Sequence, residues 1–190
     1  MSHKKFDPSR AEKLIAAERY QELKPDIILQ KLGIRSGNTI LDLGCGNGFF
    51  TFPAAVAMGE GMVIAADMSD DMLSLLRQRN TPDNIQILQV EEVKMDIEDD
   101  SVDAAVLIAV YHEFKNPMEN LAELKRTLKP GGKMLILDWD PQADKERGPG
   151  KAHRVAKIQA IKDLKAAGFT VASHENYTLD MWMIVAHSNT

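Results

Sequence analysis

The 190-residue sequence contains one cysteine, Cys45, and no apolar run long enough to span a membrane. A single cysteine forms no intramolecular disulfide and no thiolate metal cluster, and it gives no sign of an oxidising compartment. The longest apolar stretches, 104–111 and 134–137, fall well short of a transmembrane helix, and the first residues lead into no signal-peptide core. We therefore expect a cytoplasmic protein with no membrane partner.

An excess of positive charge is also missing, because 28 acidic residues outnumber 23 basic ones and give a formal net charge of −5. This charge opposes binding to a nucleic-acid backbone, so we expect no nucleic-acid partner. The five histidines form no His-Glu-x-x-His or similar ligand pattern. The acidic run 96–101 lacks the spacing and the glycine of an EF-hand loop. We assign no metal site.

Composition and pattern indicate one α/β domain. A chain of this length builds one well-buried core and is too short for two ordinary domains. Strands are predicted at 39–43, 62–66, 85–90, 102–110, 134–139, 169–174 and 177–187, with helices at 49–58, 69–79, 116–128 and 152–167. Strands that alternate with helices build a mostly parallel sheet covered on both faces. The last two strands are separated only by about Glu175-Asn176, so the final strand should run antiparallel. Asn116 is predicted to cap the helix that Pro117 begins.

The most informative motif joins the first strand to the first helix of the core, and reads Asp42-Leu43-Gly44-Cys45-Gly46-Asn47-Gly48. Gly44 permits a turn at the strand end, Gly46 lets the backbone approach a ligand, and Gly48 lets the next helix pack close to the sheet. A nicotinamide fingerprint needs glycine at position 49, where this chain has phenylalanine, and the Gly-Lys-Ser/Thr of a P-loop is absent. We therefore predict a loop that receives the zwitterionic end of a small cofactor, with Asp42 meeting its amine.

These residues resemble the first motif of the class I S-adenosylmethionine-dependent methyltransferases, Asp/Glu-x-Gly-x-Gly-x-Gly, and the resemblance covers essentially the whole chain. It implies S-adenosylmethionine as the cofactor and S-adenosylhomocysteine as the product. It also implies a doubly wound, Rossmann-like, seven-stranded sheet whose last strand is antiparallel and inserted beside the fifth. The whole chain, 1–190, would be one methyltransferase domain with a catalytic core over 36–190. Residues 1–35 would form an N-terminal helical cover, with one or two helices broken at Pro25, although packing of this segment on the sheet alone is an equal alternative.

Further cofactor contacts are expected at the ends of the next strands. Asp67 ends the second strand and would bind the ribose hydroxyls, with Met68 packed against the adenine. Glu91 aligns with an acidic position that accepts from the adenine amino group, and the Glu92 amide with a ring nitrogen, although a one-residue shift would exchange the two. The complete predicted cofactor-binding set is Asp42, Gly44, Cys45, Gly46, Asn47, Gly48, Asp67, Met68, Glu91, Glu92 and Ala109.

Residues 109–114 follow the fourth strand and are the predicted reaction centre. Methyl transfer from a sulfonium is an in-line displacement, so it depends mainly on alignment of the reacting atoms. His112 is the candidate general base, with Tyr111 lining the methyl-transfer cavity and Glu113 orienting the imidazole ring. Simple packing of His112 beside the cofactor is the alternative. Asp138 and Trp139 close the fifth strand, Tyr177 lies between the last two strands, and all three are candidates for the acceptor pocket.

The sequence thus predicts a methyltransferase that acts on a small-molecule acceptor. The Asn/Asp-Pro-Pro-Tyr/Phe motif of family members that methylate nucleic-acid bases is absent. Two other functions stay open at this point: a nicotinamide-dependent oxidoreductase, and a non-catalytic module that binds S-adenosylmethionine. The identity of the acceptor and the oligomeric state are undetermined, and a homodimer stays open.

Overall fold

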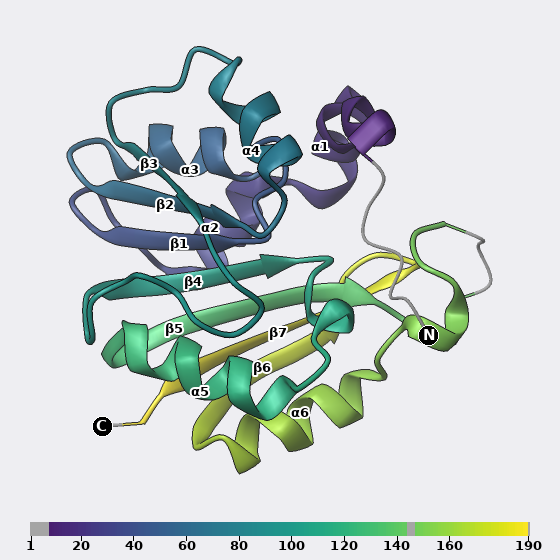
Figure 1. Cartoon of the computed structure of the whole chain (residues 1–190). Coiled ribbons are helices and arrows are strands. Elements are labelled where there is room, and N and C mark those ends of the chain that lie inside the picture. Colours follow the sequence, from purple (N-terminus) through teal and green to yellow (C-terminus); the bar gives the residue numbers. More distant parts are fainter. Residues whose placement is uncertain (1–7, 144–146, 190) are drawn as a thin grey trace.

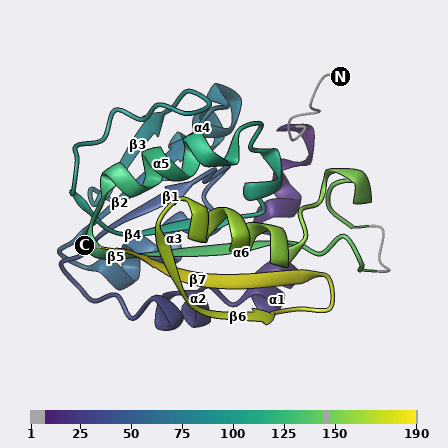
Figure 2. The same cartoon turned by 90° about the horizontal axis from the view of Figure 1, so that it is seen from below.

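A computed structural model describes residues 8–143 and 147–189 and shows a central sheet with helices on both faces (Figures 1 and 2). The seven strands lie in the order β3-β2-β1-β4-β5-β7-β6, and β7 runs antiparallel to both of its neighbours. They are β1 (Thr39–Leu43), β2 (Met62–Asp67), β3 (Ile85–Gln89), β4 (Val102–Ile108), β5 (Leu128–Trp139), β6 (Phe169–Asn176) and β7 (Met181–Ser188). The predicted fold class is confirmed, including an antiparallel last strand beside the fifth.

Six α-helices are described: α1 (Ala17–Leu23), α2 (Pro25–Leu32), α3 (Thr51–Met58), α4 (Asp70–Arg77), α5 (Pro117–Thr127) and α6 (Lys157–Ala166). Short 3-10 helices are η1 (Pro8–Ile15), η2 (Tyr111–Glu113) and η3 (Lys151–His153). The N-terminal segment therefore has three helical pieces rather than one or two, and its first residues lie outside the described part. Lys24 separates α1 from α2 with a left-handed backbone, φ 43°, and Pro25 occupies the first turn of α2.

Some predicted boundaries are wrong. Asn116 makes no side-chain cap, and its carbonyl instead accepts a hydrogen bond from the Asn120 side chain at 3.0 Å. Helix α6 begins only at Lys157, because the preceding residues form the separate turn η3. Strand β5 begins already at Leu128, which pairs with the start of β4, and β7 begins later than predicted, at Met181. Ends of elements depend on partner strands and turns that a local pattern does not show.

Side chains of each inner strand alternate between two cores. Ile40 packs with α1 to α4 on one face, while Leu41 packs with α5 and α6 on the other. Figure 2 shows α5 and α6 side by side along their face of the sheet. Burial on both faces explains why these strands are nearly continuous apolar runs. Trp182 is fully buried in the second core and donates its indole N–H to the Val155 carbonyl at 2.9 Å.

The sheet reverses its winding direction between β1 and β4, because the chain builds β2 and β3 on one side of β1 and then returns to β4. Ligands of open α/β sheets bind beyond the carboxyl ends of the strands at such a point. In Figure 1 the arrowhead of β4, helix α1 and the segment that follows β5 all lie on this side of the molecule. The fold therefore gathers the glycine loop, the N-terminal segment and residues 109–114 at one edge.

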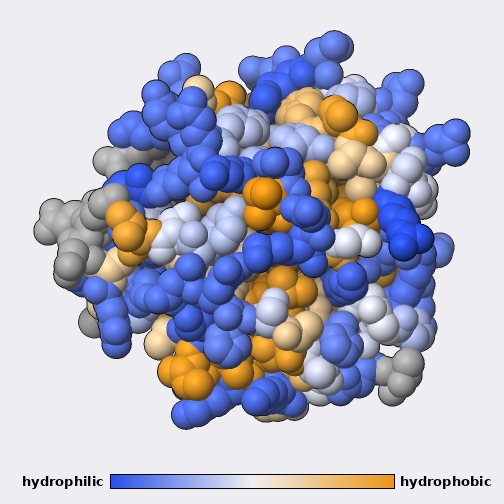
Figure 3. All heavy atoms as spheres, turned by 180° about the vertical axis from the view of Figure 1, so that it is seen from behind, coloured by the Kyte–Doolittle hydropathy of each residue, from blue (hydrophilic) through white to orange (hydrophobic). Residues whose placement is uncertain are grey.

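Hydrophilic residues cover most of the face seen in Figure 3, and apolar residues form separate patches. Within the described residues, no helix is both long enough and apolar enough to cross a membrane.

Candidate active site

A cavity of about 860 Å³ opens at the carboxyl edge of the sheet. Its size falls within the roughly 300–1,000 Å³ of small-molecule and cofactor sites. The predicted site residues that line it are Asp42, Gly44, Cys45, Gly46, Asp67, Met68, Glu91, Glu92, Ala109 and His112. Four different loops therefore bring the candidate base and all the predicted cofactor residues except Asn47 and Gly48 to one cavity.

The glycine loop follows the predicted geometry. Gly48 has φ +93°, and a Cβ there would come within 2.5 Å of Leu76 and 2.7 Å of Phe52. Gly44 has φ +71°, and a Cβ there would come within 2.3 Å of Val110, in the loop after β4. Side chains at these positions would push the loop away from both α4 and β4. Gly44 therefore keeps the backbone of the cavity wall close to the loop after β4, and Gly48 keeps the loop close to α3 and α4.

Asn47 has a different role from the one predicted. It is buried, its side-chain amide donates to the Ala11 carbonyl at 2.8 Å, and its own carbonyl accepts from Arg79 at 2.7 Å. Neither Asn47 nor Gly48 lines the cavity. Asn47 therefore joins the glycine loop to η1, and the structure gives no support to a cofactor contact by either residue.

Asp42 presents a buried carboxyl group to the cavity. Thr51 donates its hydroxyl to Asp42 Oδ2 at 2.6 Å. Burial raises the pKa of Asp42 from 3.8 to about 7; the Asp67 charge adds to this rise, while the Thr51 hydrogen bond and the Arg19 charge oppose it. A cation bound nearby would favour the ionised form. The environment of Asp42 is thus suited to an ammonium group.

Asp67 is fixed at the end of β2 by two loops. Its Oδ2 accepts the Gly46 backbone N–H at 2.8 Å, and its Oδ1 accepts the Ser69 N–H at 2.9 Å. A carboxylate oxygen has two lone pairs and can accept more than one hydrogen bond. The assignment of Asp67 to the ribose hydroxyls stays a prediction.

Two glutamates follow β3 at the rim of the cavity. Glu91 is exposed, and Glu92 forms an ion pair with Lys115 at 2.6 Å. The pair links the loop after β3 to the loop after β4. The assignment of Glu91 to the adenine amino group stays a prediction.

His112 is held by Asp138, at the end of β5. Its Nδ1 lies 2.8 Å from Asp138 Oδ1, and its backbone N–H donates to Asp138 Oδ2 at 2.9 Å. Because a carboxylate only accepts hydrogen bonds, Nδ1 carries the proton and Nε2 keeps the basic lone pair. Burial alone would lower the pKa of His112, but the hydrogen bond and charge of Asp138, with Glu113, raise it above 6.5. The imidazole is therefore oriented and more basic than a free one.

Three predictions about this centre are corrected. Tyr111 does not line the cavity: it is fully buried in the second core, contacts Trp182, and donates its hydroxyl to Asp163 at 2.8 Å. The turn η2 places neighbouring side chains on different sides, so Tyr111 faces away when His112 faces the cavity. Asp138, rather than Glu113 at 3.9 Å from Nε2, is the close partner of the ring, and Asp138 itself does not line the cavity.

Ala109 begins this turn with φ +59°, a left-handed conformation that is unfavourable for residues other than glycine. Its backbone N–H donates to the Leu137 carbonyl at 2.8 Å, which holds it to β5. The strained residue lets the chain leave β4 abruptly, and this places His112 over Asp138.

Two cationic side chains that the sequence did not single out, Arg19 and Arg147, also line the cavity. Arg147 forms ion pairs with Glu22 at 2.6 Å and with Asp180 at 3.2 Å, and its guanidinium lies 6.0 Å from the centroid of the Trp139 ring. Arg19 reaches the cavity from α1. No local motif marks these arginines, because their common location depends on tertiary packing.

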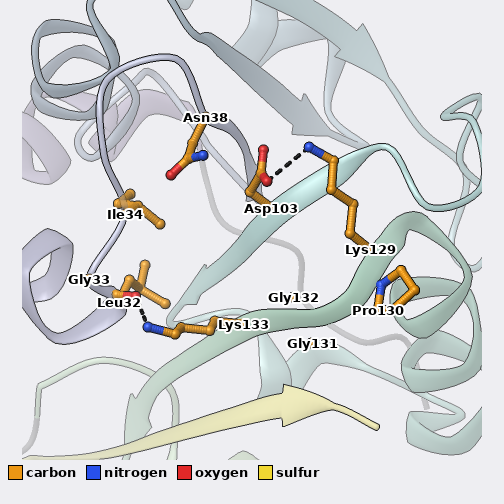
Figure 4. A pocket seen from close by; sticks show the side chains of 10 residues that line it. All are labelled: Leu32, Gly33, Ile34, Asn38, Asp103, Lys129, Pro130, Gly131, Gly132 and Lys133. Atoms are coloured by element: carbon orange, nitrogen blue, oxygen red, sulfur yellow. Dashed lines mark hydrogen bonds and ion pairs between the residues drawn. The ribbon is translucent and has the colours of Figure 1, made fainter. Parts of the chain in front are cut away.

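A smaller hollow of about 220 Å³ lies at the opposite, amino-terminal edge of the sheet (Figure 4). Both of its lysines are engaged: Lys133 donates to the Leu32 carbonyl at 2.6 Å, and Lys129 pairs with Asp103 at 2.8 Å. These contacts tie α2 and β4 to β5. The lysines of this hollow therefore have a structural role, and none of the predicted site residues line it.

Comparison with known proteins agrees with this geometry. A family model described as a methyltransferase domain matches residues 41–136. The crystal structure of a SAM dependent methyltransferase from Aquifex aeolicus is 28% identical, with a TM-score of 0.91, and the match covers 96% of this chain and 99% of that one. The chain belongs to the class I S-adenosylmethionine-dependent methyltransferases. The nicotinamide alternative is therefore wrong.

Curated relatives of this methyltransferase include a demethylmenaquinone methyltransferase of Clavibacter sepedonicus, 29% identical over 149 residues. That match covers 77% of this chain and 60% of the relative. The ubiquinone/menaquinone biosynthesis C-methyltransferase UbiE of Marinomonas sp. (strain MWYL1) is 30% identical over 116 residues, which cover 58% of this chain and 46% of the relative. The chain thus spans about half the length of these relatives.

The residues of this methyltransferase fit the family's cofactor, S-adenosylmethionine. A side chain on Gly44 would collide with Val110, so the cavity wall at the glycine loop is bare backbone. Asp42 offers a carboxyl group suited to the ammonium group, and Asp67 offers a carboxylate for the ribose. Among the described residues that line the cavity, Asp42, Gly44, Gly46 and Asp67 would hold the cofactor.

Proposed function

We propose that the protein transfers a methyl group from S-adenosylmethionine to a small-molecule acceptor that loses a proton to His112. The observation that supports this most is the His112–Asp138 pair beside the glycine-loop cavity, with Nδ1 and Oδ1 2.8 Å apart. A module that only bound the cofactor would not need an oriented imidazole at this position. The geometry therefore favours catalysis over binding alone.

The cofactor, when bound, would supply an electrophilic methyl group on a sulfonium. His112 Nε2 would accept the proton that the acceptor loses as its nucleophilic atom takes this methyl group, and S-adenosylhomocysteine would leave as the second product. Asp138 is a positioning residue here, because it fixes the tautomer and stabilises the imidazolium that forms.

The acceptor we propose is a small aromatic molecule with an ionisable hydroxyl group, such as a quinol. Phe49, Phe114 and Trp139 line the cavity and offer apolar contact to a ring. Removal of a hydroxyl proton makes a ring carbon more nucleophilic, which gives His112 a task. The names of the quinone-methylating relatives also support a small aromatic acceptor.

Calorimetry with S-adenosylhomocysteine, and with NADH for comparison, tests the cofactor. We expect micromolar or tighter binding of the first only, and no binding of S-adenosylhomocysteine would refute the proposed function. Mass spectrometry with deuteromethyl-labelled cofactor and a short-chain demethylmenaquinol then tests the acceptor. If the protein binds the cofactor but no labelled quinol forms, the proposed acceptor class is refuted and the methyltransferase function is not.

Two histidine variants test the base. His112→Gln should lower turnover by about 10²- to 10⁴-fold, the usual contribution of a general base. His174→Gln is the matched control, because His174 lies exposed on β6 and outside the cavity. Equal turnover of the two variants would assign His112 to packing alone.

A further inference from the structure

Arg19 carries a charge into the cavity without a counterion in the described structure. It lies on α1, lines the cavity, and is half-buried. Within residues 8–143 and 147–189, no carboxylate or carbonyl lies within ion-pair or hydrogen-bond distance of its guanidinium. Its close contact is with the face of the Phe49 ring, 4.7 Å from guanidinium carbon to centroid. The five N–H donors of Arg19 thus have room for an anion.

The neighbours of Arg19 show that it lies at the glycine-loop end of the cavity. Phe49 directly follows the glycine loop. The charges of Tyr20, Glu22 and Asp42 raise the pKa of Arg19, and Arg19 in turn lowers that of Asp42. Burial outweighs these attractions and lowers the pKa of Arg19 to about 10, so the group stays protonated at neutral pH. A cation and a buried acid beside one glycine loop match the two charges of an amino acid.

Arg147 differs from Arg19 because its guanidinium forms ion pairs with carboxylates. It also lines the cavity, but its charge is already balanced by Glu22 and Asp180, and its guanidinium lies 6.0 Å from the centroid of the Trp139 ring. The uncompensated cation is therefore at the glycine-loop end rather than beside Trp139.

We propose that Arg19 binds the carboxylate of the cofactor's amino-acid end, so that the N-terminal segment forms part of the cofactor site. This inference rests on the proposed function, because it takes S-adenosylmethionine as the ligand. A guanidinium can form two parallel hydrogen bonds to a carboxylate, and Asp42 serves the adjacent ammonium group.

The same contact couples the cofactor to the N-terminal segment. Ala11 accepts a hydrogen bond from Asn47, and the Tyr20 ring packs on Phe49 at 4.7 Å between centroids. These contacts hold the segment on the glycine loop, and a carboxylate on Arg19 would add a charged link to them. A ligand that carries the carboxylate should therefore stabilise α1 more than one that lacks it.

Binding of two ligands to Arg19→Met tests the proposal. S-adenosylhomocysteine carries the amino-acid end, whereas 5′-methylthioadenosine keeps the adenosine and lacks that end. We expect R19M to weaken S-adenosylhomocysteine by about 10- to 100-fold, as for loss of a hydrogen bond to a charged group, and to leave methylthioadenosine unchanged. Unchanged methylthioadenosine binding also shows that the variant is folded.

Two further variants sharpen this test. Arg19→Lys keeps the charge and should recover part of the affinity for S-adenosylhomocysteine. Arg77→Met is the matched control, because Arg77 lies on α4 outside the cavity, and it should bind both ligands like the wild type. If R19M binds S-adenosylhomocysteine normally, or loses affinity for both ligands equally, the proposal is overturned.

Hydrogen exchange on the unmodified protein gives a second readout. S-adenosylhomocysteine should slow amide exchange in residues 17–23 more than saturating methylthioadenosine does. Equal protection by the two ligands would overturn the coupling. A wild type that binds neither ligand would instead refute the proposed function, so the two failures are distinguishable.

Discussion

Cofactor affinity should depend on pH through Asp42. Its pKa of about 7 in the folded, cofactor-free protein means that much of the carboxyl group is protonated at neutral pH. An ammonium ligand favours the ionised form, so binding must release a proton wherever Asp42 is protonated. Affinity should therefore rise with pH up to and through 7. The matched variant is Asp42→Asn, which keeps the shape and removes the titration.

The expected size follows from the fraction of ionised Asp42. With a pKa of about 7, that fraction is about 3% at pH 5.5 and about 75% at pH 7.5, so S-adenosylhomocysteine should bind about 25-fold more tightly at the higher pH. Calorimetry at pH 7 in two buffers of different ionisation enthalpy should detect release of about half a proton. The pKa of His112 is raised by Asp138, so this histidine is a second source of pH dependence, and its contribution is measured as the pH dependence that remains in D42N.

Unfolding of the cofactor-free protein gives an independent check of the same pKa. The folded-state pKa of Asp42 lies above the ordinary 3.8, so the folded state favours the protonated acid. Stability from this group is fully present below about pH 3.8 and declines as pH rises towards 7, at a total cost of about 4 kcal/mol. D42N should thus exceed the wild type in stability at pH 8 and lose most of that gain by pH 4. Parallel pH profiles for wild type and D42N, in both binding and unfolding, would refute the reasoning.

Three other substitutions test the site geometry. Asp138→Asn should lower the pKa of His112, because the charge and hydrogen bond that raise it are lost. An unchanged pKa in an NMR titration would contradict the pairing of His112 with Asp138. Tyr111→Phe should cost about 1 kcal/mol of stability, because the half-buried Asp163 carboxylate loses one donor and keeps Gln159. Calorimetry should find unchanged cofactor affinity, and a weakened affinity would contradict the burial of Tyr111 away from the cavity. Gly48→Ala should lower the thermal midpoint, since φ +93° alone costs about 1–2 kcal/mol, and an unchanged midpoint would show that the loop adapts freely.

Much of the fold could be read from local patterns. Strand β4 is an apolar run because it is buried on both faces, and the glycines that follow β1 mark a loop that α3 and α4 approach closely. The antiparallel β7 follows from a connection too short for a crossover. The start of β5 at Leu128 was missed, because pairing with β4 rather than its own sequence makes it a strand.

Some site residues could be predicted from the sequence and others could not. His112 and Asp67 were identified because they follow strands, and parallel strands bring their carboxyl ends to one edge. The direction of neighbouring side chains within residues 109–114 could not be read, because it depends on the turn at Ala109. The role of Asp138 as partner of His112 depended on adjacent strands β4 and β5 and on register.

The sequence by itself determined the cofactor class and predicted the edge of the sheet for its site, because glycines at fixed spacing and strand-end acids are local requirements of that chemistry. Only the tertiary structure decided which side chains act together: Asp138 with His112, Asn47 with Ala11, and Arg19 beside the glycine loop. Residues distant in sequence meet through packing, and the burial that sets the pKa values of Asp42 and Arg19 exists only once the chain is folded.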